Sequence, residues 1–150
     1  IIGKIIHNLK YNYVEDLQIL LTKIIRDFVK LRPNLFINVG QIIPIPLHKK
    51  RYAERGFNQA EIIAQLLSQE LSIPINKNLQ RTKHTKQQAK LNKEERQNNT
   101  KDAFVFSGKI SGEILLVDDV FTTGSTMQAC AKVLRENGVE KIIGFTLARG

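Results

Sequence analysis

The sequence contains very little cysteine and histidine. Its 150 residues include one cysteine, Cys130, and three histidines that lie far apart in the chain. A disulfide needs two cysteines, and a structural zinc site needs several Cys or His ligands at short spacings. This chain therefore has no internal disulfide framework and no multi-cysteine zinc site. Cys130 falls in a helical pattern with Met127, Ala131 and Leu134, and we predict an inert thiol in the core.

Long apolar runs are also missing. No run approaches the roughly 20 residues that a helix needs to cross a bilayer. The first nine residues contain Lys4, His7 and Asn8, which do not suit the apolar core of a signal peptide. We therefore expect a cytoplasmic protein without a membrane span. With 42% hydrophobic residues, a chain of this length can bury the core of one ordinary domain.

Acidic residues are scarce in two segments, and this makes the chain basic. The net charge is +9, and all of the excess lies in residues 47–58 and 77–101. Two basic segments on a neutral body suit a polyanion, either a polyphosphate ligand or the backbone of a nucleic acid. A solvated surface is the alternative, and charge alone leaves all three open.

The first half of the chain predicts a long helix followed by a strand. Between Val14 and Leu31 apolar residues recur at helical spacing, and Pro33 ends the pattern. The segment Gln41–Leu47 is short and rich in Ile, which predicts a buried strand. The first basic segment follows this strand, and we expect it to be a loop.

A second helix and a long loop come next. Asn58 and Glu61 have the form of a capping box, and the apolar residues after them predict a helix that runs to about Ser72. Between Asn76 and Asp102 the residues are polar and basic with almost no apolar periodicity. This composition predicts a long flexible loop.

The last third of the chain reads as strand, helix, strand. Residues 114–117 form an apolar run that ends at Asp118 and Asp119, a polar turn follows, and a helical pattern then continues to about Gly138. Residues 141–147 supply another apolar strand, so the two strands should be parallel with a right-handed crossover. We predict an α/β fold with a central, mainly parallel sheet of about four to five strands flanked by helices, and Asp118 at the carboxyl end of a strand.

The turn after the acidic pair combines two kinds of binding group. Backbone N–H groups at the start of a helix favour a phosphate, and the Thr and Ser hydroxyls add donors. Two adjacent carboxylates would repel a phosphate unless they bind something else, and sugar hydroxyls are the obvious partners. A ribose 5-phosphate carries both a phosphate and sugar hydroxyls, and so suits both kinds of group. The pattern is neither a Walker A loop, which needs a Lys after its last Gly, nor the dinucleotide-binding G-x-G-x-x-G.

These residues resemble a known family. The segment ILLVDDVFTTGST (114–126) is similar to the signature loop of type I phosphoribosyltransferases, with Phe121 slightly larger than the usual aliphatic residue. The resemblance extends to the ComF competence-protein branch through PIPLHKKRYAERGFNQAE (44–61), RTKHTKQQAKLNKEERQNN (81–99) and the final TLARG, and so covers nearly the whole chain. It implies one phosphoribosyltransferase-like domain over 1–150, with an N-terminal helical part (1–40) and a core (41–150).

The resemblance also implies site residues. Asp118 and Asp119 would bind the ribose hydroxyls, directly or through a bound magnesium ion. The 5-phosphate would contact Thr122, Thr123, Gly124, Ser125 and Thr126. The pyrophosphate would contact Lys50, Arg51, Arg55 and Gly56, and the flexible loop would add Lys83, His84 and Lys86.

The expected function follows from the same resemblance. The chain should bind phosphoribosyl pyrophosphate with magnesium, as substrate or ligand, in a protein linked to DNA uptake and natural transformation. Single-stranded DNA and the competence helicase or recombination proteins are candidate partners. Two alternatives are a nucleobase or amine phosphoribosyltransferase of nucleotide metabolism and a ligand-sensing regulator on the same fold. The branch commonly begins with a four-cysteine zinc module, which we expect to be absent here.

Overall fold

A three-stranded parallel sheet lies at the centre of the fold. The structure is a computed structural model that describes residues 14–82, 103–110 and 112–150. Within these residues the central strands, in spatial order, are β1 (Val39–Pro44), β4 (Glu113–Phe121) and β5 (Ile142–Arg149). The middle strand, β4, is parallel to both neighbours, which confirms the predicted parallel strand, helix, strand unit.

Among the described residues the central sheet has three strands, fewer than the four to five that we predicted. In the described part of the chain, the segment on the outer side of β1 makes one isolated parallel bridge, between Ile75 and Ile42. Ile42 donates to the carbonyl of Pro74 and accepts from the N–H of Asn76. The next bond in either direction would need the N–H of Pro74 or of Pro44, and proline has none. The pairing therefore does not extend into a fourth strand.

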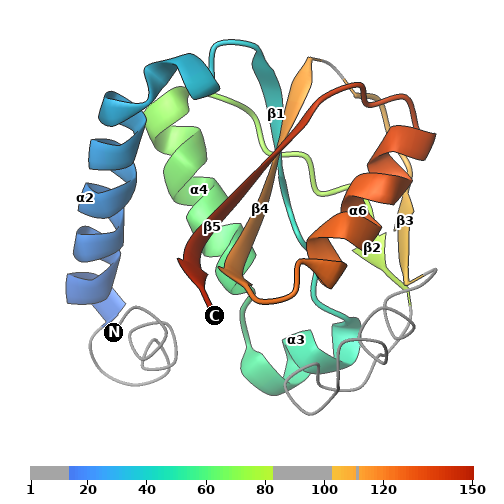
Figure 1. The fold of residues 1–150 in the computed structure, drawn as a ribbon. Coiled ribbons are helices and arrows are strands. Elements are labelled where there is room, and N and C mark those ends of the chain that lie inside the picture. The colour runs from blue at the N-terminus through green and yellow to red at the C-terminus, as the bar shows by residue number, and fades with distance from the viewer. Residues whose placement is uncertain (1–13, 83–102, 111) are drawn as a thin grey trace.

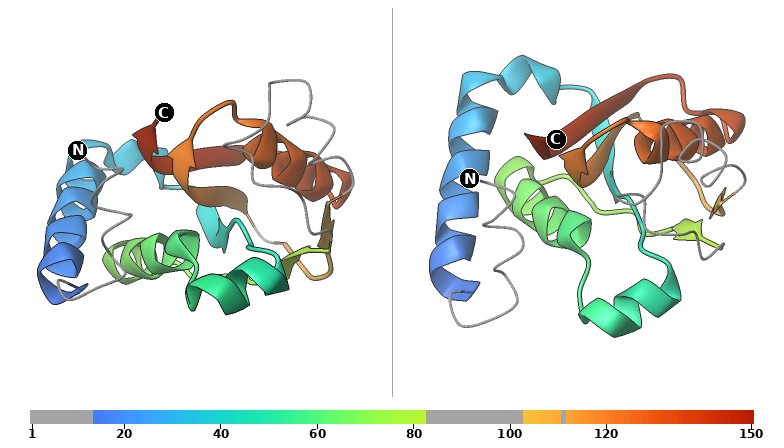
Figure 2. Two further views of the ribbon diagram at one scale, coloured as in Figure 1. Left: turned by 90° about the horizontal axis from the view of Figure 1, so that it is seen from below. Right: turned by 60° about the horizontal axis from the view of Figure 1, so that its bottom comes forward.

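Helices cover one face of the sheet, and a helix with a small antiparallel hairpin layer covers the other (Figure 1). On the first face lie α2 (Val14–Leu31) and α4 (Gln59–Leu71). On the second lie α6 (Ser125–Glu136) and the two-stranded sheet of β2 (Leu79–Arg81) and β3 (Phe104–Phe106). Figure 2 shows the central strands between these two layers. This is the predicted α/β architecture.

Side-chain alternation along β4 builds both halves of the core. Leu115 and Val117 pack in the cluster on the α2 and α4 side, whereas Ile114 and Leu116 pack in the cluster on the α6 side. Successive residues of a strand point to opposite faces, so a run of apolar residues is what a strand covered on both faces requires. Cys130 is fully buried in the α6-side cluster, and burial raises the pKa of its thiol, which confirms the predicted core thiol.

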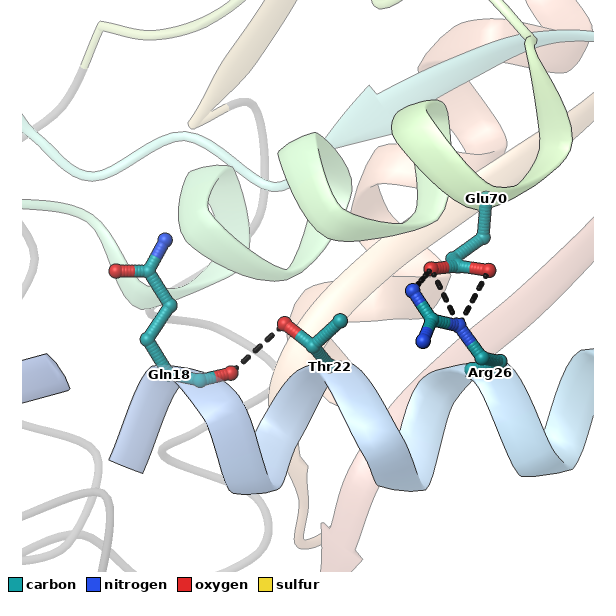
Figure 3. A network of polar contacts seen from close by, with 4 residues as sticks. All are labelled: Gln18, Thr22, Arg26 and Glu70. Carbon is teal, nitrogen blue, oxygen red and sulfur yellow. Dashed lines mark hydrogen bonds and ion pairs between the residues drawn. The ribbon is translucent and has the colours of Figure 1, made fainter. Parts of the chain in front are cut away.

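The helix α2 has the predicted bounds and packs on α4. Leu21 and Ile25 are buried against the core, and Pro33 begins a short 3-10 helix, η1 (Pro33–Leu35), just after α2 ends. Arg26 donates to both carboxylate oxygens of Glu70 on α4, at 3.0 Å and 3.1 Å from Nε and 2.7 Å from an Nη atom (Figure 3). Among the described residues, no helix is both long and apolar enough to cross a membrane.

The helix α4 begins after Asn58 and ends before Ser72, as predicted, but its cap differs from a reciprocal capping box. The side-chain oxygen of Asn58 accepts from the N–H of Ala60 at 3.1 Å. Its amide nitrogen donates to the Ile45 carbonyl at 3.0 Å and to Glu61 at 3.4 Å. Asn58 is 4% exposed and thus fixes the start of α4 against the end of β1.

The first basic segment is a helix rather than the loop that we predicted. The helix α3 (Lys49–Arg55) is capped by the His48 ring, which accepts from Lys50 N–H at 3.2 Å. It ends at Gly56, whose φ of 78° is the left-handed conformation common after helices, and the Gly56 N–H bonds to the Tyr52 carbonyl. The helix carries no apolar stripe, so periodicity could not predict it.

The predicted loop between Asn76 and Asp102 also contains regular structure. The strand β2 occupies Leu79–Arg81 and pairs with β3. Leu79 and Arg81 face inward while Gln80 faces outward, a pattern of three residues that is too short to be recognised in the sequence. Residues 83–102, to which the rest of the flexible-loop prediction applies, lie outside the described residues.

Candidate functional site

The carboxyl ends of β1 and β4 meet at one edge of the sheet and open onto a cavity. The helix α3 follows β1 at this edge, and the connection from β4 to α6 lies beside it (Figure 1). The cavity has a volume of about 250 Å³. Its lining includes most of the residues that the sequence predicted for a binding site, namely Arg51, Arg55, Asp118, Asp119, Thr122, Gly124, Ser125 and Thr126.

The other predicted site residues take different places. Lys50 and Gly56 are exposed residues of α3 and its cap, and neither lines the cavity. Thr123 also does not line it, but its hydroxyl lies 3.1 Å from the Ser125 hydroxyl and helps to shape the turn. The predicted loop contacts Lys83, His84 and Lys86 lie outside the described residues.

The two acidic residues lie within β4, because this strand continues to Phe121 instead of ending before them. Asp118 is opposite Thr146 of β5 in the parallel register. Since residues 114 and 116 face the α6 side and residues 115 and 117 face the α4 side, Asp118 continues the first series and Asp119 the second. Both residues nevertheless line the same cavity at this end of the strand, where a hydrogen bond between their side chains helps to raise the pKa of Asp118. Each accepts the N–H of the next residue at 2.9 Å.

Their surroundings make Asp118 an unusual carboxyl group. Burial and, next, the neighbouring charge of Asp119 together raise the pKa of Asp118 to about 7, while the Arg81 guanidinium opposes the rise. Asp118 thus stands between its neutral and ionised forms near neutral pH. A bound cation, or donors from a ligand, would favour the carboxylate.

The turn between β4 and α6 presents backbone donors to the cavity. Gly124 is the N-cap of α6 with φ of 74°, a conformation that favours glycine. A Cβ at this position would lie 2.7 Å from the Phe121 ring, so the turn has no room for a side chain here. The first N–H groups of α6 have no intrahelical acceptors and, with the helix dipole, suit a phosphate.

Three arginines from two elements face this turn across the cavity. Arg51 and Arg55 lie one helical turn apart on α3, and Arg81 comes from the end of β2. Burial lowers the pKa of Arg51, and the charge of Arg55 lowers it further. Burial also lowers the pKa of Arg81, followed by the charge of Arg51. These cations repel one another, and an anionic ligand would relieve the repulsion.

Sequence reasoning did not predict Arg81 or Asn58 as cavity residues. Asn58 was recognised as a helix cap, and it lines the cavity because α4 starts where β1 ends. Arg81 opens the segment 81–99 that carried part of the family resemblance, but no binding role was predicted for it.

The donor set fits magnesium bound together with a phosphate ligand. Magnesium usually takes one or two carboxylates and completes its coordination with water and substrate phosphates. Asp118 and Asp119 can supply such carboxylates beside a phosphate turn. Among the described residues, no group of three or more His, Cys, Asp or Glu side chains could hold a metal ion without such a ligand.

Comparisons with known proteins agree with this geometry. The family model of the phosphoribosyl transferase domain matches residues 53–150. The chain is 43% identical over 113 residues to competence protein F of Haemophilus influenzae, a match that covers 72% of this chain and 49% of that protein. It is 36% identical over 110 residues to competence protein ComFC of Streptococcus pneumoniae, covering 73% and 48% of the two chains.

A third relative and a solved structure extend the similarity. The chain is 31% identical over 149 residues to DNA utilization protein YhgH of Escherichia coli O157:H7, covering 97% of this chain and 66% of that protein. By contrast, the matches to the two competence proteins span only about half the length of those proteins. The purine phosphoribosyltransferase of Pyrococcus horikoshii has the same fold, with a TM-score of 0.54 and 15% identity over 93% of this chain and 76% of that one.

Proposed function

The chain belongs to the phosphoribosyltransferase family, in the ComF branch of its type I members, and from this premise we propose that it binds phosphoribosyl pyrophosphate with magnesium in the cavity beside β4. One observation carries the proposal. The cavity brings together a phosphate turn at the start of α6, two carboxylates of β4 and the arginines of α3. A 5-phosphate, ribose hydroxyls and a pyrophosphate need these three kinds of group.

Each part of the ligand has a place in this arrangement. The 5-phosphate accepts hydrogen bonds from the turn Thr122–Thr126, where Gly124 allows a close approach of the backbone. The ribose hydroxyls donate to Asp118 and Asp119. The pyrophosphate lies toward Arg51 and Arg55, whose guanidinium groups match phosphate oxygens in pairs.

The arrangement suits transfer of the phosphoribosyl group to an acceptor. When the C1–O bond breaks, the pyrophosphate leaves with the electron pair, and positive charge develops on C1 and the ring oxygen. Arg51 and Arg55 stabilise the charge on the leaving group, and Asp118 and Asp119 hold the sugar in place. A bound magnesium ion would supply further positive charge at the pyrophosphate. Catalysis would thus be mainly electrostatic.

Calorimetric titration of the chain with phosphoribosyl pyrophosphate, with and without magnesium, tests this proposal. We expect saturable binding that weakens when magnesium is chelated. Replacing Asp118 and Asp119 together by Asn should lower the affinity by about tenfold or more, since hydrogen bonds to a charged group contribute about 1.5 to 3 kcal/mol each. The matched control is Glu136→Gln with Glu140→Gln, which removes two exposed carboxylates away from the cavity.

Two outcomes would contradict the proposal. Absence of binding by the unaltered chain in the presence of magnesium would refute phosphoribosyl pyrophosphate as the ligand. Unchanged affinity in a folded double Asn variant would remove the ribose role from both carboxylates.

Single-stranded DNA is a second candidate ligand, at a different surface. Lys49 and Lys50 are exposed residues of α3, and Tyr52 of the same helix is 46% exposed. Cations beside an exposed ring suit the backbone and a stacked base of a single strand. The names of the relatives, competence protein and DNA utilization protein, favour the same ligand class. We propose DNA handling as a role that accompanies the phosphoribosyl site.

A further inference from the structure

The strand β5 forms one edge of the central sheet. Among residues 14–82, 103–110 and 112–150, β4 is the strand that pairs with it, and no strand pairs with its other side. Proteins usually protect such an edge with charged residues or prolines, because an unpaired edge can bind another strand. Residues 142–148 include neither a charged residue nor a proline. The edge of β5 is therefore suited to pairing with a further strand.

A stripe of exposed apolar side chains runs along α2. Leu20, Ile24, Phe28 and Leu31 follow one another at spacings of three or four residues, which places them on one side of the helix. We call these four residues the exposed stripe, since their exposed fractions lie between 37% and 77%. Other residues of α2 already pack in the core cluster. The exposed stripe is thus apolar surface that the described fold leaves uncovered.

The exposed stripe faces the edge of β5. Arg26, which binds Glu70 of α4, is two positions from both Ile24 and Phe28, and two positions turn a helix by about 200°. The stripe therefore points away from α4 (Figure 3). On its own side, the Phe28 ring lies 5.6 Å from the ring of Phe145 in β5, centre to centre. The stripe and the β5 edge form one continuous surface.

A second copy of the chain fits both parts of this surface at once. A two-fold axis perpendicular to the sheet would place the two β5 strands antiparallel and join two three-stranded sheets into one. The same axis keeps both α2 helices on one face of the joined sheet. Their exposed stripes then meet in antiparallel orientation, in which the helix dipoles also attract each other.

The charges on α2 are complementary in this arrangement. Lys23 and Asp27 are exposed on the outer side of the helix, beside the stripe. With the axis near Ile24, Lys23 of each copy comes near Asp27 of the other, so the attraction occurs twice. Residues 15 and 16 are acidic and Lys30 lies in the last turn, so opposite charges also approach at both ends of the helix pair.

We propose that the β5 edge and the exposed stripe join two copies of the chain in a two-fold dimer. None of the residues that line the cavity belongs to α2 or β5, so the dimer does not use the cavity. Because the β5 strands run in opposite directions, the two cavities lie at opposite ends of the joined sheet. Each remains open to its own ligand.

Sedimentation velocity over a series of protein concentrations tests the dimer. The unaltered chain should change from monomer to dimer as the concentration rises. Ile24→Lys should raise the dimer dissociation constant by about 100-fold or more, because it removes two apolar contacts per dimer and brings two ammonium groups together. Its affinity for phosphoribosyl pyrophosphate should not change, so a failure of dimer formation and a failure of ligand binding are separate results.

Ile19→Lys is the matched control. Ile19 is also an exposed residue of α2, but it lies about 140° around the helix from Ile24 and outside the stripe. The dissociation constant of this variant should stay within about twofold of the unaltered value, as for an ordinary surface substitution. Thermal unfolding identifies a variant that is not folded. If Ile24→Lys does not fold, Leu31→Lys, which changes a side chain that is 77% exposed, takes its place.

Two further measurements test the geometry of the dimer. Lys23→Glu should raise the dissociation constant by about tenfold, and adding Asp27→Lys should restore it to within about threefold, because opposite charges then face each other again. In the dimer, some amides of residues 142–149 should exchange hydrogen more slowly than in Ile24→Lys at the same concentration, since β5 gains a second strand neighbour.

The proposal is overturned if the unaltered chain stays monomeric at the highest concentration that remains soluble, because another occupant would then cover this surface. Equal weakening of the dimer by Ile19→Lys and Ile24→Lys would overturn it as well. A dimer in which the hydrogen exchange of β5 is unchanged, or in which the losses from Lys23→Glu and Asp27→Lys add, would contradict the antiparallel two-fold arrangement.

Discussion

Asp118 is a carboxyl group whose charge is costly in the ligand-free fold. Burial is the main reason that its pKa is raised to about 7, and the adjacent Asp119 charge is the second. Groups with strongly shifted pKa values concentrate at functional sites, where a ligand rather than the fold compensates their charge. The position of Asp118 at the cavity is consistent with such a role.

The stability of the ligand-free chain should therefore respond to pH through Asp118. Its pKa in the folded state, about 7, lies above the unfolded value of roughly 3.9, so ionisation of Asp118 destabilises the fold as pH rises from about 4 to about 7. We expect Asp118→Asn to raise the melting temperature at pH 8, with a gain that shrinks toward pH 4. Each kcal/mol corresponds to about 2–4 °C in a domain of this size. Thermal unfolding across this pH range measures the effect.

The exposed Glu140 supplies the control for this prediction. Glu140→Gln removes one negative charge from the surface, and the pH dependence of its melting temperature should follow that of the unaltered chain. A lower melting temperature of Asp118→Asn at pH 8 would show that the carboxylate is stabilised, not strained, in the fold.

The sequence predicted the contiguous part of the site and missed the distant part. The acidic pair and the turn to Thr126 lie in one segment, so their residue types alone indicated phosphate and hydroxyl binding. Arg81 lies 37 residues before Asp118 in the sequence. It reaches the same cavity from β2, which pairs with β3. No local pattern reports such a tertiary contact. Arg51 and Arg55 were predicted from charge and resemblance, and α3 turns both toward the cavity.

At the scale of elements, the turn between β4 and α6 depends on Gly124. We expect Gly124→Ala to lower both the stability and the affinity for phosphoribosyl pyrophosphate, because the φ of 74° is strained for alanine and its Cβ would lie 2.7 Å from the Phe121 ring. The ring or the turn must move, and either movement changes the phosphate site. We expect a loss of affinity of about tenfold or more, by analogy with other small displacements of positioned groups. Calorimetry and thermal unfolding measure the two effects.

Gly138 provides a matched control, since its φ of 89° is also positive but a Cβ there would have nothing within 4 Å. Gly138→Ala should therefore lose about 1 kcal/mol of stability from backbone strain and keep its ligand affinity. Adding Phe121→Leu to Gly124→Ala should restore part of the affinity if contact with the ring is the cause. Equal effects of the two Gly substitutions on binding would contradict a special role of the turn.

The accuracy of the element predictions followed the strength of the local signal. The helix α2 was predicted with its observed bounds, because an apolar stripe defines it and Pro33 ends it. The helix α3 was missed because it carries charged residues in place of an apolar stripe, and β4 was predicted too short because Asp118 and Asp119 interrupt its apolar run. Those residues remain in the strand since β5 pairs with them as far as Phe121. Pairing with a neighbour, rather than residue type, decided the end of β4.

At the scale of the whole molecule, the positive charge serves two different surfaces. Arg51 and Arg55 of α3 line the cavity, while Lys49 and Lys50 of the same helix are exposed to solvent. The second basic segment, residues 77–101, adds many more cations than one pyrophosphate requires. A small polyphosphate and a long polyanion could then bind with different subsets of the basic residues. Substitutions of single subsets can separate the binding of the small polyphosphate from that of the polyanion.

The salt dependence of DNA binding distinguishes these subsets. If the second basic segment contacts a DNA backbone, log affinity for a single strand should fall with log salt by about 0.7 for each phosphate neutralised. Replacing Lys90, Lys93 and Arg96 by Gln should then flatten this slope by roughly 2 and leave the calorimetric affinity for phosphoribosyl pyrophosphate within about twofold. The variant with Asn at positions 118 and 119 should behave in the opposite way, with weak ligand binding and an unchanged salt slope. Fluorescence anisotropy with a labelled oligonucleotide measures the slope. If single strands fail to bind even at low ionic strength, this part of the chain does not handle DNA directly, and the cations of the second segment act only on the phosphoribosyl ligand.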